Sequence, residues 1–188
     1  KYITINEKER ILKNDFDYLW KLLWKNYNIS KFKKDYEISK SKFNKLKEGY
    51  EINNIIINLE YLVEKTKNNT FEETELEFPK GRRNLNENNI NAALREFEEE
   101  SGLSRDKINL INNKSYEEIY IAVNNIRYRH IYYIAKCKNF KNIHNLFNPN
   151  NKIQIKEVKD VEWFNYFEII NNIRDIYIER IELFKRIN

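Results

Sequence analysis

The stretch FPKGRRNLNENNINAALREFEEESGL, residues 78–103, carries the strongest pattern in this chain of 188 residues. It holds two of the chain's three glycines, Gly81 and Gly102, and one of its two prolines. Between the glycines, residues 88–101 have the apolar spacing of an amphipathic helix. Gly102 is placed to end that helix, because glycine adopts the left-handed backbone conformation at a helix C-terminus without steric cost. We therefore expect a loop that leads into a helix, with a glycine at each end.

The two faces of this predicted helix differ in chemistry. Its apolar stripe is formed by Ile90, Ala93, Leu94 and Phe97. At about 100° per residue, Glu96, Glu99 and Glu100 fall together on the opposite side, whereas Glu98 points elsewhere. Carboxylates so close together repel one another unless cations lie among them, and hard divalent ions such as Mg²⁺ prefer oxygen ligands. The face is typical of a metal site for phosphate chemistry; a solvated acidic surface is the alternative.

Composition limits the other kinds of site. The formal net charge of +5 and the pI near 9.0 favour a polyanionic partner. The only cysteine, Cys137, excludes an internal disulfide, and His130 and His144 are too far apart for a standard zinc spacing. No apolar run approaches the length of a membrane span, so we expect an intracellular protein with no membrane partner. Because the chain begins at Lys1 and contains no methionine, we also expect residues before Lys1 to be missing.

The sequence pattern of the first third of the chain predicts helices. Thr4 and Glu7 match a capping box that opens a helix over residues 4–27. A second, lysine-rich helix or helix pair is expected over 31–48, and a further helix over 52–67. We therefore expect a basic helical subdomain over residues 1–67.

The rest of the chain, residues 68–188, predicts a mixed core of the α+β class. Two strands, YEEIYIAV (116–123) and YRHIYYIAK (128–136), read as a hairpin turning at Asn124 and Asn125. Further strands are expected over 76–81 and 155–164. A closing helix is expected over 166–187.

The spacing of the motif residues resembles a known family. Gly81 is followed after five residues by Glu87, and after seven more by the run REFEEESGL, residues 95–103. This arrangement resembles the Nudix box at every specified position. The resemblance implies a Nudix fold, a mixed β-sheet sandwiched by helices, here with an N-terminal helical insertion. It also implies hydrolysis of a nucleoside diphosphate linked to a second group.

The flanking sequence narrows the resemblance. EFPKGR (77–82) and REFEEESGLSR (95–105) are similar to the mRNA-decapping Nudix enzymes of large cytoplasmic DNA viruses, the asfarvirus and mimivirus type. INEKERILKNDFDYLWKLLW (5–24) resembles their helical insertion. The implied reaction removes the 5′ cap of mRNA with Mg²⁺ or Mn²⁺ and releases 7-methyl-GDP and RNA with a 5′-monophosphate. The implied location is the cytoplasm, in a host cell or virus factory.

The resemblance implies roles for individual residues. Glu96, Glu99, Glu100 and the carbonyl of Gly81 would hold the ions, and Glu100 or Glu157 would take a proton from water. We expect Gly81 to let the backbone turn toward the metal. Glu157 is implicated by the family's glutamate on the matching strand; a surface glutamate is the alternative, and Asp160 and Glu162 are neighbouring candidates.

Three further expectations concern the supporting residues. Glu87 pairs with Arg95 as a structural brace, and Lys80 contacts a phosphate. The lysines of the second helix, interleaved with Phe32, Tyr36 and Phe43, form a phosphate track for RNA, with Lys31, Lys33 and Lys34 at its start. The aromatic residues among them favour a core position.

Two alternatives stay open. The substrate can be a diphosphoinositol polyphosphate or a dinucleoside polyphosphate, because a basic groove suits these dense anions as well as capped mRNA. The chain can also be a non-catalytic Nudix domain that binds RNA. The complete glutamate set argues against the second alternative.

Overall fold

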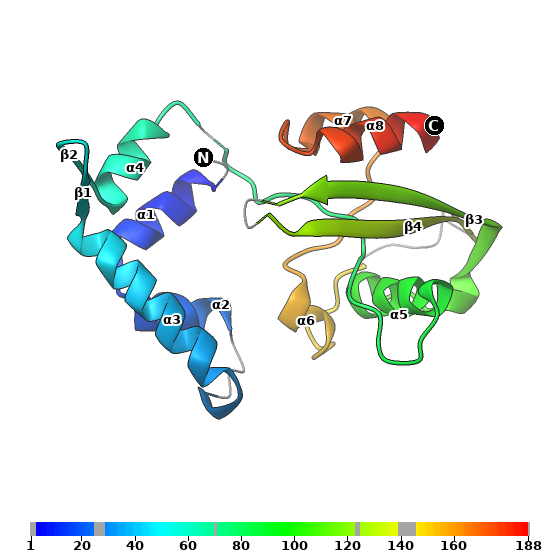
Figure 1. The fold of residues 1–188 in the computed structure, drawn as a ribbon. Helices are drawn as coiled ribbons and strands as arrows, with labels where there is room; N and C mark the ends of the chain where they lie inside the picture. Colours follow the sequence, from blue (N-terminus) through cyan, green and yellow to red (C-terminus); the bar gives the residue numbers. More distant parts are fainter. Residues whose placement is uncertain (1–2, 25–28, 70, 123–124, 139–145, 188) are drawn as a thin grey trace. The chain divides into compact units, whose positions relative to one another are not determined.

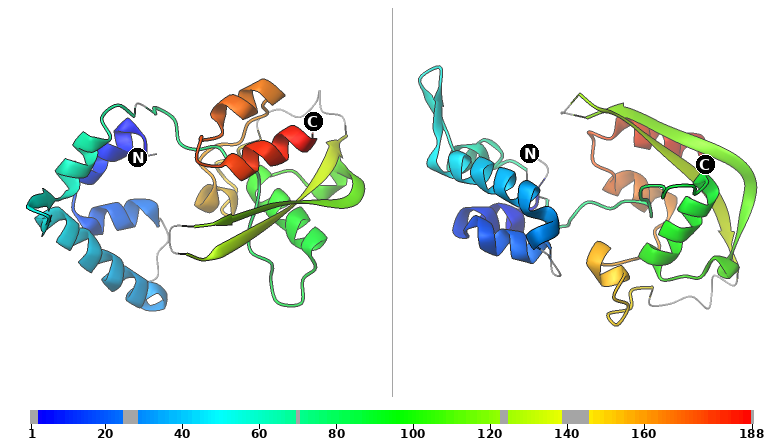
Figure 2. Two further views of the ribbon diagram at one scale, coloured as in Figure 1. Left: turned by 45° about the horizontal axis from the view of Figure 1, so that its top comes forward. Right: turned by 60° about the horizontal axis from the view of Figure 1, so that its bottom comes forward.

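The computed structural model describes residues 3–24, 29–69, 71–122, 125–138 and 146–187. The chain divides into two compact units, residues 1–74 and 75–188, each of which is described by itself. Figure 1 shows the order of the elements along the chain, and Figure 2 gives two further views. None of the helices in the described part of the chain has both the length and the apolar content needed to cross a membrane.

The first unit consists of four helices and a small hairpin. Its elements are α1 (Ile5–Lys13), α2 (Phe16–Leu23), α3 (Ile29–Glu48), β1 (Tyr50–Ile52), β2 (Ile55–Ile57) and α4 (Leu59–Lys65). The capping box at Thr4 and Glu7 is confirmed. The single helix expected over 4–27 is instead divided, because the Asp15 side chain caps α2 by accepting a hydrogen bond from the backbone N–H of Tyr18.

Aromatic rings form the centre of this unit. Phe16 is buried, and its ring centroid lies 5.4 Å from those of Trp20 and Tyr36 and 5.8 Å from that of Phe43. The core position expected for Tyr36 and Phe43 is therefore confirmed. The side chain of Phe32 lies outside the described part.

The helix expected over 52–67 was wrong in its first half. Strands β1 and β2 pair antiparallel, and Asn53 and Asn54 between them have φ angles of 50° and 62°. Two consecutive left-handed residues make the tight turn that suits a two-residue hairpin, and asparagine tolerates this conformation. The hairpin therefore forms where helical spacing alone predicted a helix. Helix α4 then begins with Asn58 as its cap.

The second unit contains a long β-hairpin with helices packed around it. Its elements are α5 (Asn89–Ser101), a short 3₁₀ helix η1 (Arg105–Lys107), β3 (Ile108–Ile121), β4 (Arg127–Cys137), α6 (Gln154–Glu157), α7 (Tyr166–Asn172) and α8 (Ile178–Ile187). Helices α5 and α8 lie on opposite sides of the antiparallel β3–β4 hairpin (Figures 1 and 2). The expected α+β class and the expected hairpin are confirmed, and both strands run further than the sequence indicated.

The motif helix forms as expected. Asn88 caps α5 by accepting a hydrogen bond from the N–H of Asn91, and Gly102 ends the helix with φ of 71°. At the hairpin turn, Asn125 has φ of 59°, while its neighbour Asn124 lies outside the described residues.

Three other expectations for this unit were wrong. Residues 76–81 are irregular, and the N–H of Lys80 donates to the Glu100 carboxylate instead of to a strand. Residues 155–164 contain no strand: Asn151 accepts hydrogen bonds from the N–H groups of Ile153 and Gln154 at the start of α6, and residues 158–164 are irregular. The closing helix is divided into α7 and α8 by the extended backbone at Ile173.

Candidate metal centre

Three glutamates from two elements converge. Glu96 and Glu99 lie on α5 and Glu157 ends α6, and each offers a carboxylate oxygen within 4.8 Å of the others. Glu96 is buried, Glu99 is partly exposed and Glu157 is exposed. Glu157 was expected on a strand, and the structure brings it to the α5 glutamates from a helical turn instead. The neighbouring candidates Asp160 and Glu162 are not members of this cluster.

Gly81 lies directly against the cluster. A Cβ atom on Gly81 would fall 2.1 Å from the carboxyl carbon of Glu96. The φ angle of Gly81 is not in the left-handed region, unlike those of Gly49 and Gly102. The expected backbone turn is therefore not made with a left-handed φ, and the lack of a side chain at Gly81 also leaves room for the Glu96 carboxylate.

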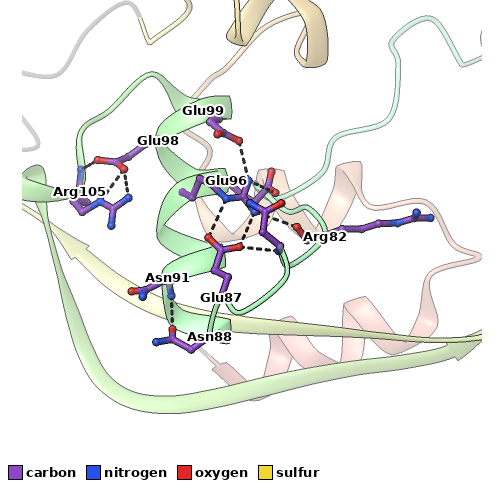
Figure 3. Close-up of polar contacts among 10 residues, drawn as sticks. Arg82, Glu87, Asn88, Asn91, Glu96, Glu98, Glu99 and Arg105 are labelled. Carbon is purple, nitrogen blue, oxygen red and sulfur yellow. Dashed lines mark hydrogen bonds and ion pairs between the residues drawn. The ribbon is translucent and has the colours of Figure 1, made fainter. Parts of the chain in front are cut away.

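Arg95 ties the loop before α5 to the helix. Its guanidinium donates to both carboxylate oxygens of Glu87, at 3.0 and 3.1 Å. The Nη1 atom of Arg95 also lies 2.6 Å from Glu96 and 3.0 Å from Glu99. Arg95 therefore holds Glu87 and fixes the side chains of two cluster glutamates. Figure 3 shows Glu98 turned away from the cluster toward Arg105, at 2.5 Å.

Glu100 has a different environment from the other glutamates of α5. Burial raises its pKa to about 7, and repulsion from Glu96 and Glu157 acts in the same direction. Its one hydrogen-bond donor among the described residues is the backbone N–H of Lys80, at 3.0 Å. The side chain of Lys80 instead pairs with Glu77, at 2.9 Å. Glu100 is thus a carboxylate able to exchange a proton near neutral pH.

Gln154 explains how Glu157 reaches α5. Its side chain is fully buried and donates to the carbonyl oxygens of Glu100, at 3.0 Å, and Leu146, at 2.9 Å. Its own oxygen accepts from the N–H of Asn148, at 2.7 Å. The C-terminal end of α5 therefore anchors α6, and Glu157 lies three residues after this anchor. Sequence reasoning missed Gln154, since a single glutamine in a polar stretch gives no signal of burial.

A second polar cluster, also missed, is buried on the α8 side of the hairpin. Arg180 is 2% exposed and Glu118 is 1% exposed, and Arg180 Nε donates to Glu118 at 3.2 Å. Tyr132 and His130 contact the other oxygen of Glu118, at 2.8 and 3.1 Å. Arg180 also lies 3.6 Å from Glu75 and 3.5 Å from Glu77. The alternating pattern of the strand predicts that Glu118 is exposed. Its burial depends on a partner far along the chain, Arg180.

The donor set of the first cluster suits a hard divalent cation. Glu96, Glu99 and Glu157 supply carboxylate oxygens alone, with no sulfur or imidazole ligand among them, and Glu100, which was expected as a further ligand, is not a member of this cluster. Burial, together with repulsion from Glu96 and Glu157, raises the pKa of the neighbouring Glu100 carboxyl, so this end of α5 disfavours further negative charge.

The expected lysine track lies in the first unit. Lys33 and Lys34 are exposed on α3, and Lys31 belongs to the same helix, although its side chain lies outside the described part. Lys40 instead pairs with Asp17, at 2.9 Å, and the hydroxyl of Tyr36 donates to the same carboxylate. At least one lysine of the track therefore has a structural partner.

The chain is similar to proteins of one known family. Residues 54–186 match the model of the NUDIX domain family. The chain is 34% identical over 161 residues to a putative mRNA-decapping protein of Acanthamoeba polyphaga mimivirus, covering 84% of this chain and 43% of the relative. It is 30% identical over 169 residues to the mRNA-decapping protein g5R of African swine fever virus, isolate Pig/Kenya/KEN-50/1950, covering 87% of this chain and 63% of the relative. The chain thus spans about half of the length of these relatives.

Proposed function

Because the chain belongs to the Nudix family, as its motif and the domain match show, we propose that it is a pyrophosphohydrolase that removes the 5′ cap of mRNA. The products would be 7-methyl-GDP and RNA with a 5′-monophosphate. The supporting observation is the convergence of Glu96, Glu99 and Glu157 beside Glu100. The two viral relatives, both named as mRNA-decapping proteins, support the choice of substrate.

The glutamates would divide the chemistry among them. Nudix hydrolases generally use divalent metal ions, and we propose Mg²⁺ or Mn²⁺, held by Glu96, Glu99, Glu100, Glu157 and the carbonyl of Gly81. When bound, such an ion neutralises charge on phosphate oxygens and lowers the pKa of water. Glu100 would take the proton of the attacking water, since burial raises the pKa of its carboxyl to about 7 in the protein without an ion and thereby makes it a stronger base. Glu157 is the second candidate for this role.

Two cations would support the reaction from either side. Arg95, held by Glu87, keeps Glu96 and Glu99 in place as a structural brace. Lys80 is the proposed phosphate contact. Its ammonium group would leave the ion pair with Glu77 and bind a phosphate of the substrate. This exchange involves a partly exposed ion pair, which costs little to break.

We further propose that residues 1–67 form a helical insertion that holds the RNA body and that residues 68–188 form the Nudix core. The exposed Lys33 and Lys34 on α3, with Lys31, would neutralise RNA phosphates. Binding should then weaken with salt, with a slope of about −0.7 per phosphate contact. Replacing these three lysines by glutamate should flatten the slope and spare hydrolysis of a cap dinucleotide. Equal losses on both substrates would argue against this role.

The deciding experiment uses cap-labelled RNA and, separately, diphosphoinositol and dinucleoside polyphosphates, with products resolved by chromatography. Release of 7-methyl-GDP from RNA, dependent on divalent ions, is expected. Cleavage of inositol or dinucleoside substrates alone would replace the proposed substrate. RNA binding without any hydrolysis would make the chain a non-catalytic domain. We place the reaction in the cytoplasm, where capped mRNA is translated.

A further inference from the structure

The loop between Gly81 and Glu87 has a fixed backbone. Arg95 Nη2 donates to the carbonyl of Arg82, at 3.0 Å. The N–H of Asn84 donates to the Glu87 carboxylate, at 2.9 Å, and the N–H of Glu87 donates back to the carbonyl of Asn84, at 3.2 Å. These bonds tie the loop to α5 through Arg95. The loop is therefore a rigid platform directly beside the metal centre.

Two adjacent arginines on this platform have no anionic partner. Arg82 and Arg83 are exposed, and neither guanidinium forms an ion pair or hydrogen bond within the described part of the chain. Figure 3 shows the Arg82 side chain extending away from Glu87, Glu96 and Glu99. Four other arginines of this unit, in contrast, pair with carboxylates: Arg95, Arg105, Arg129 and Arg180.

The chemistry of an unpaired arginine pair points to phosphate. A guanidinium presents its donors in a planar fork that fits phosphate oxygens bidentately. The carboxylates of Glu87, Glu96 and Glu99 are held by Arg95, and the exposed guanidinium groups of Arg82 and Arg83 are accessible to an external anion. The tip of the loop, Leu85, is 93% exposed, so the unit itself does not cover these side chains.

Position decides which phosphate they would reach. Consecutive Cα atoms lie about 3.8 Å apart, so both arginines lie within about 8 Å of Gly81 along the chain. Gly81 touches Glu96, where the reacting pyrophosphate would lie. Because the Arg82 side chain extends away from that cluster, it would meet groups of the substrate beyond the pyrophosphate. In capped RNA these groups are the cap nucleoside on one side and the RNA chain on the other, and the anions that a guanidinium binds are the phosphodiesters of the RNA chain.

We propose that Arg82 and Arg83 bind the first phosphodiesters of the RNA chain, next to the pyrophosphate that is cleaved. The inference rests on the proposed decapping function and names a specificity determinant of that site. It means that the enzyme favours a cap attached to at least a short RNA over a cap dinucleotide. The effect is separate from the lysines of α3, since it is already present with RNA of a few nucleotides.

The test compares Arg82→Gln/Arg83→Gln with the wild-type chain on a capped RNA of about four nucleotides and on a cap dinucleotide. We expect KM for the short RNA to rise about tenfold, the loss typical of one charge-assisted hydrogen bond, with kcat unchanged. The dinucleotide, which has no phosphodiester, should be hydrolysed as before. Arg127→Gln is the matched control, because Arg127 is an exposed arginine on the hairpin of the same unit. It should leave both substrates unaffected.

A modified substrate gives an independent reading. In this substrate the first phosphodiesters of the capped RNA are replaced by neutral methylphosphonates. Compared with unmodified capped RNA, it should have a higher KM for the wild-type chain and the same KM for the double variant. Equal losses on the dinucleotide and the short RNA, or no loss on either, would overturn the inference.

Failure of the proposed function is distinguishable from failure of this inference. If the wild-type chain releases no cap, the role of Arg82 and Arg83 can still be tested by RNA binding. Fluorescence anisotropy, without divalent ions, would measure binding of a labelled 5′-monophosphate RNA of four nucleotides. Weaker binding by Arg82→Gln/Arg83→Gln than by Arg127→Gln would support the arginine pair. Equal binding by the two variants would reject it.

Discussion

The second unit contains two clusters of glutamates, each arranged around one arginine, and they differ in how far the protein satisfies them. In the cluster on the α8 side, Glu118 has both oxygens bonded, one to Arg180 and the other to Tyr132 and His130. In the α5 cluster, Arg95 contacts Glu96 and Glu99, but no cationic side chain within the described residues pairs with Glu100 or Glu157. Around Glu118, removal of one partner would leave a buried charge without compensation, whereas the α5 cluster leaves carboxylates for an ion from solution.

The largest effect is expected from opening the closed cluster. Replacing Arg180 by methionine leaves Glu118 buried without its cation, and breaking a buried pair in this way costs about 3–5 kcal/mol. We expect a loss of that size in the free energy of unfolding, measured by urea titration. Adding Glu118→Gln to this variant should restore part of the loss. A change below about 1 kcal/mol would show that Arg180 does not hold the cluster together.

The next effect concerns the open cluster. Glu99→Gln or Glu100→Gln should lower turnover by at least about two orders of magnitude, or about 2.7 kcal/mol of transition-state stabilisation. The melting temperature should stay close to that of the wild type, because neither side chain is in the apolar core. Glu98→Gln is the control on the same helix, since Glu98 faces Arg105. Near-normal activity in either test variant would contradict the metal assignment.

The brace between the loop and α5 should give a smaller effect on activity. Glu87→Gln weakens the grip on Arg95 and thereby loosens Glu96 and Glu99, and such supporting contacts typically cost about 10- to 100-fold in metal affinity or activity. We expect weaker Mn²⁺ binding by calorimetry, together with a lower melting temperature.

Arg95→Ala separates the brace from an alternative. A brace predicts that this variant loses both stability and activity. Unchanged melting with complete loss of activity would instead make Arg95 a substrate contact.

The smallest effect is a pH dependence in the closed cluster. Burial and the neighbouring Glu77 raise the pKa of Glu75 above its usual 4.5. The folded state therefore favours protonated Glu75, so this group's contribution to stability is lost as pH rises from 4.5 through the raised pKa. Glu75→Gln, which imitates the protonated form, should match the wild type in stability at about pH 4 and equal or exceed it at about pH 8. Lower stability of the variant at pH 8, measured by urea titration, would contradict this assignment.

The sequence predicted the local parts of the site well. Helix α5 and its glutamate face follow from periodicity, and the pairing of Glu87 with Arg95 follows from the motif. The family resemblance and the Nudix fold are confirmed by the domain match. Glu157 was identified by resemblance, although its secondary structure was wrong.

The parts that were missed depend on distant contacts. Burial of Glu118 depends on Arg180, 62 residues further along the chain. The hairpin at Asn53 and Asn54 was missed because its isoleucines also fit a helical spacing. The periodicity of one segment predicts neither the burial of a polar residue nor the pairing of strands.

The anchoring of α6 by Gln154 has a consequence for how the site is assembled. Glu96 and Glu99 are one helical turn apart, whereas Gln154 is 54 residues from the Glu100 carbonyl that it binds. Closing such a loop has an entropic cost that the buried hydrogen bonds of Gln154 must offset. An ion shared by α5 and Glu157 would bind only the closed form, so ion concentration would control how often this segment opens. Hydrogen exchange of the α6 amides would then slow as the ion is added, which would let backbone protection serve as a measure of ion occupancy.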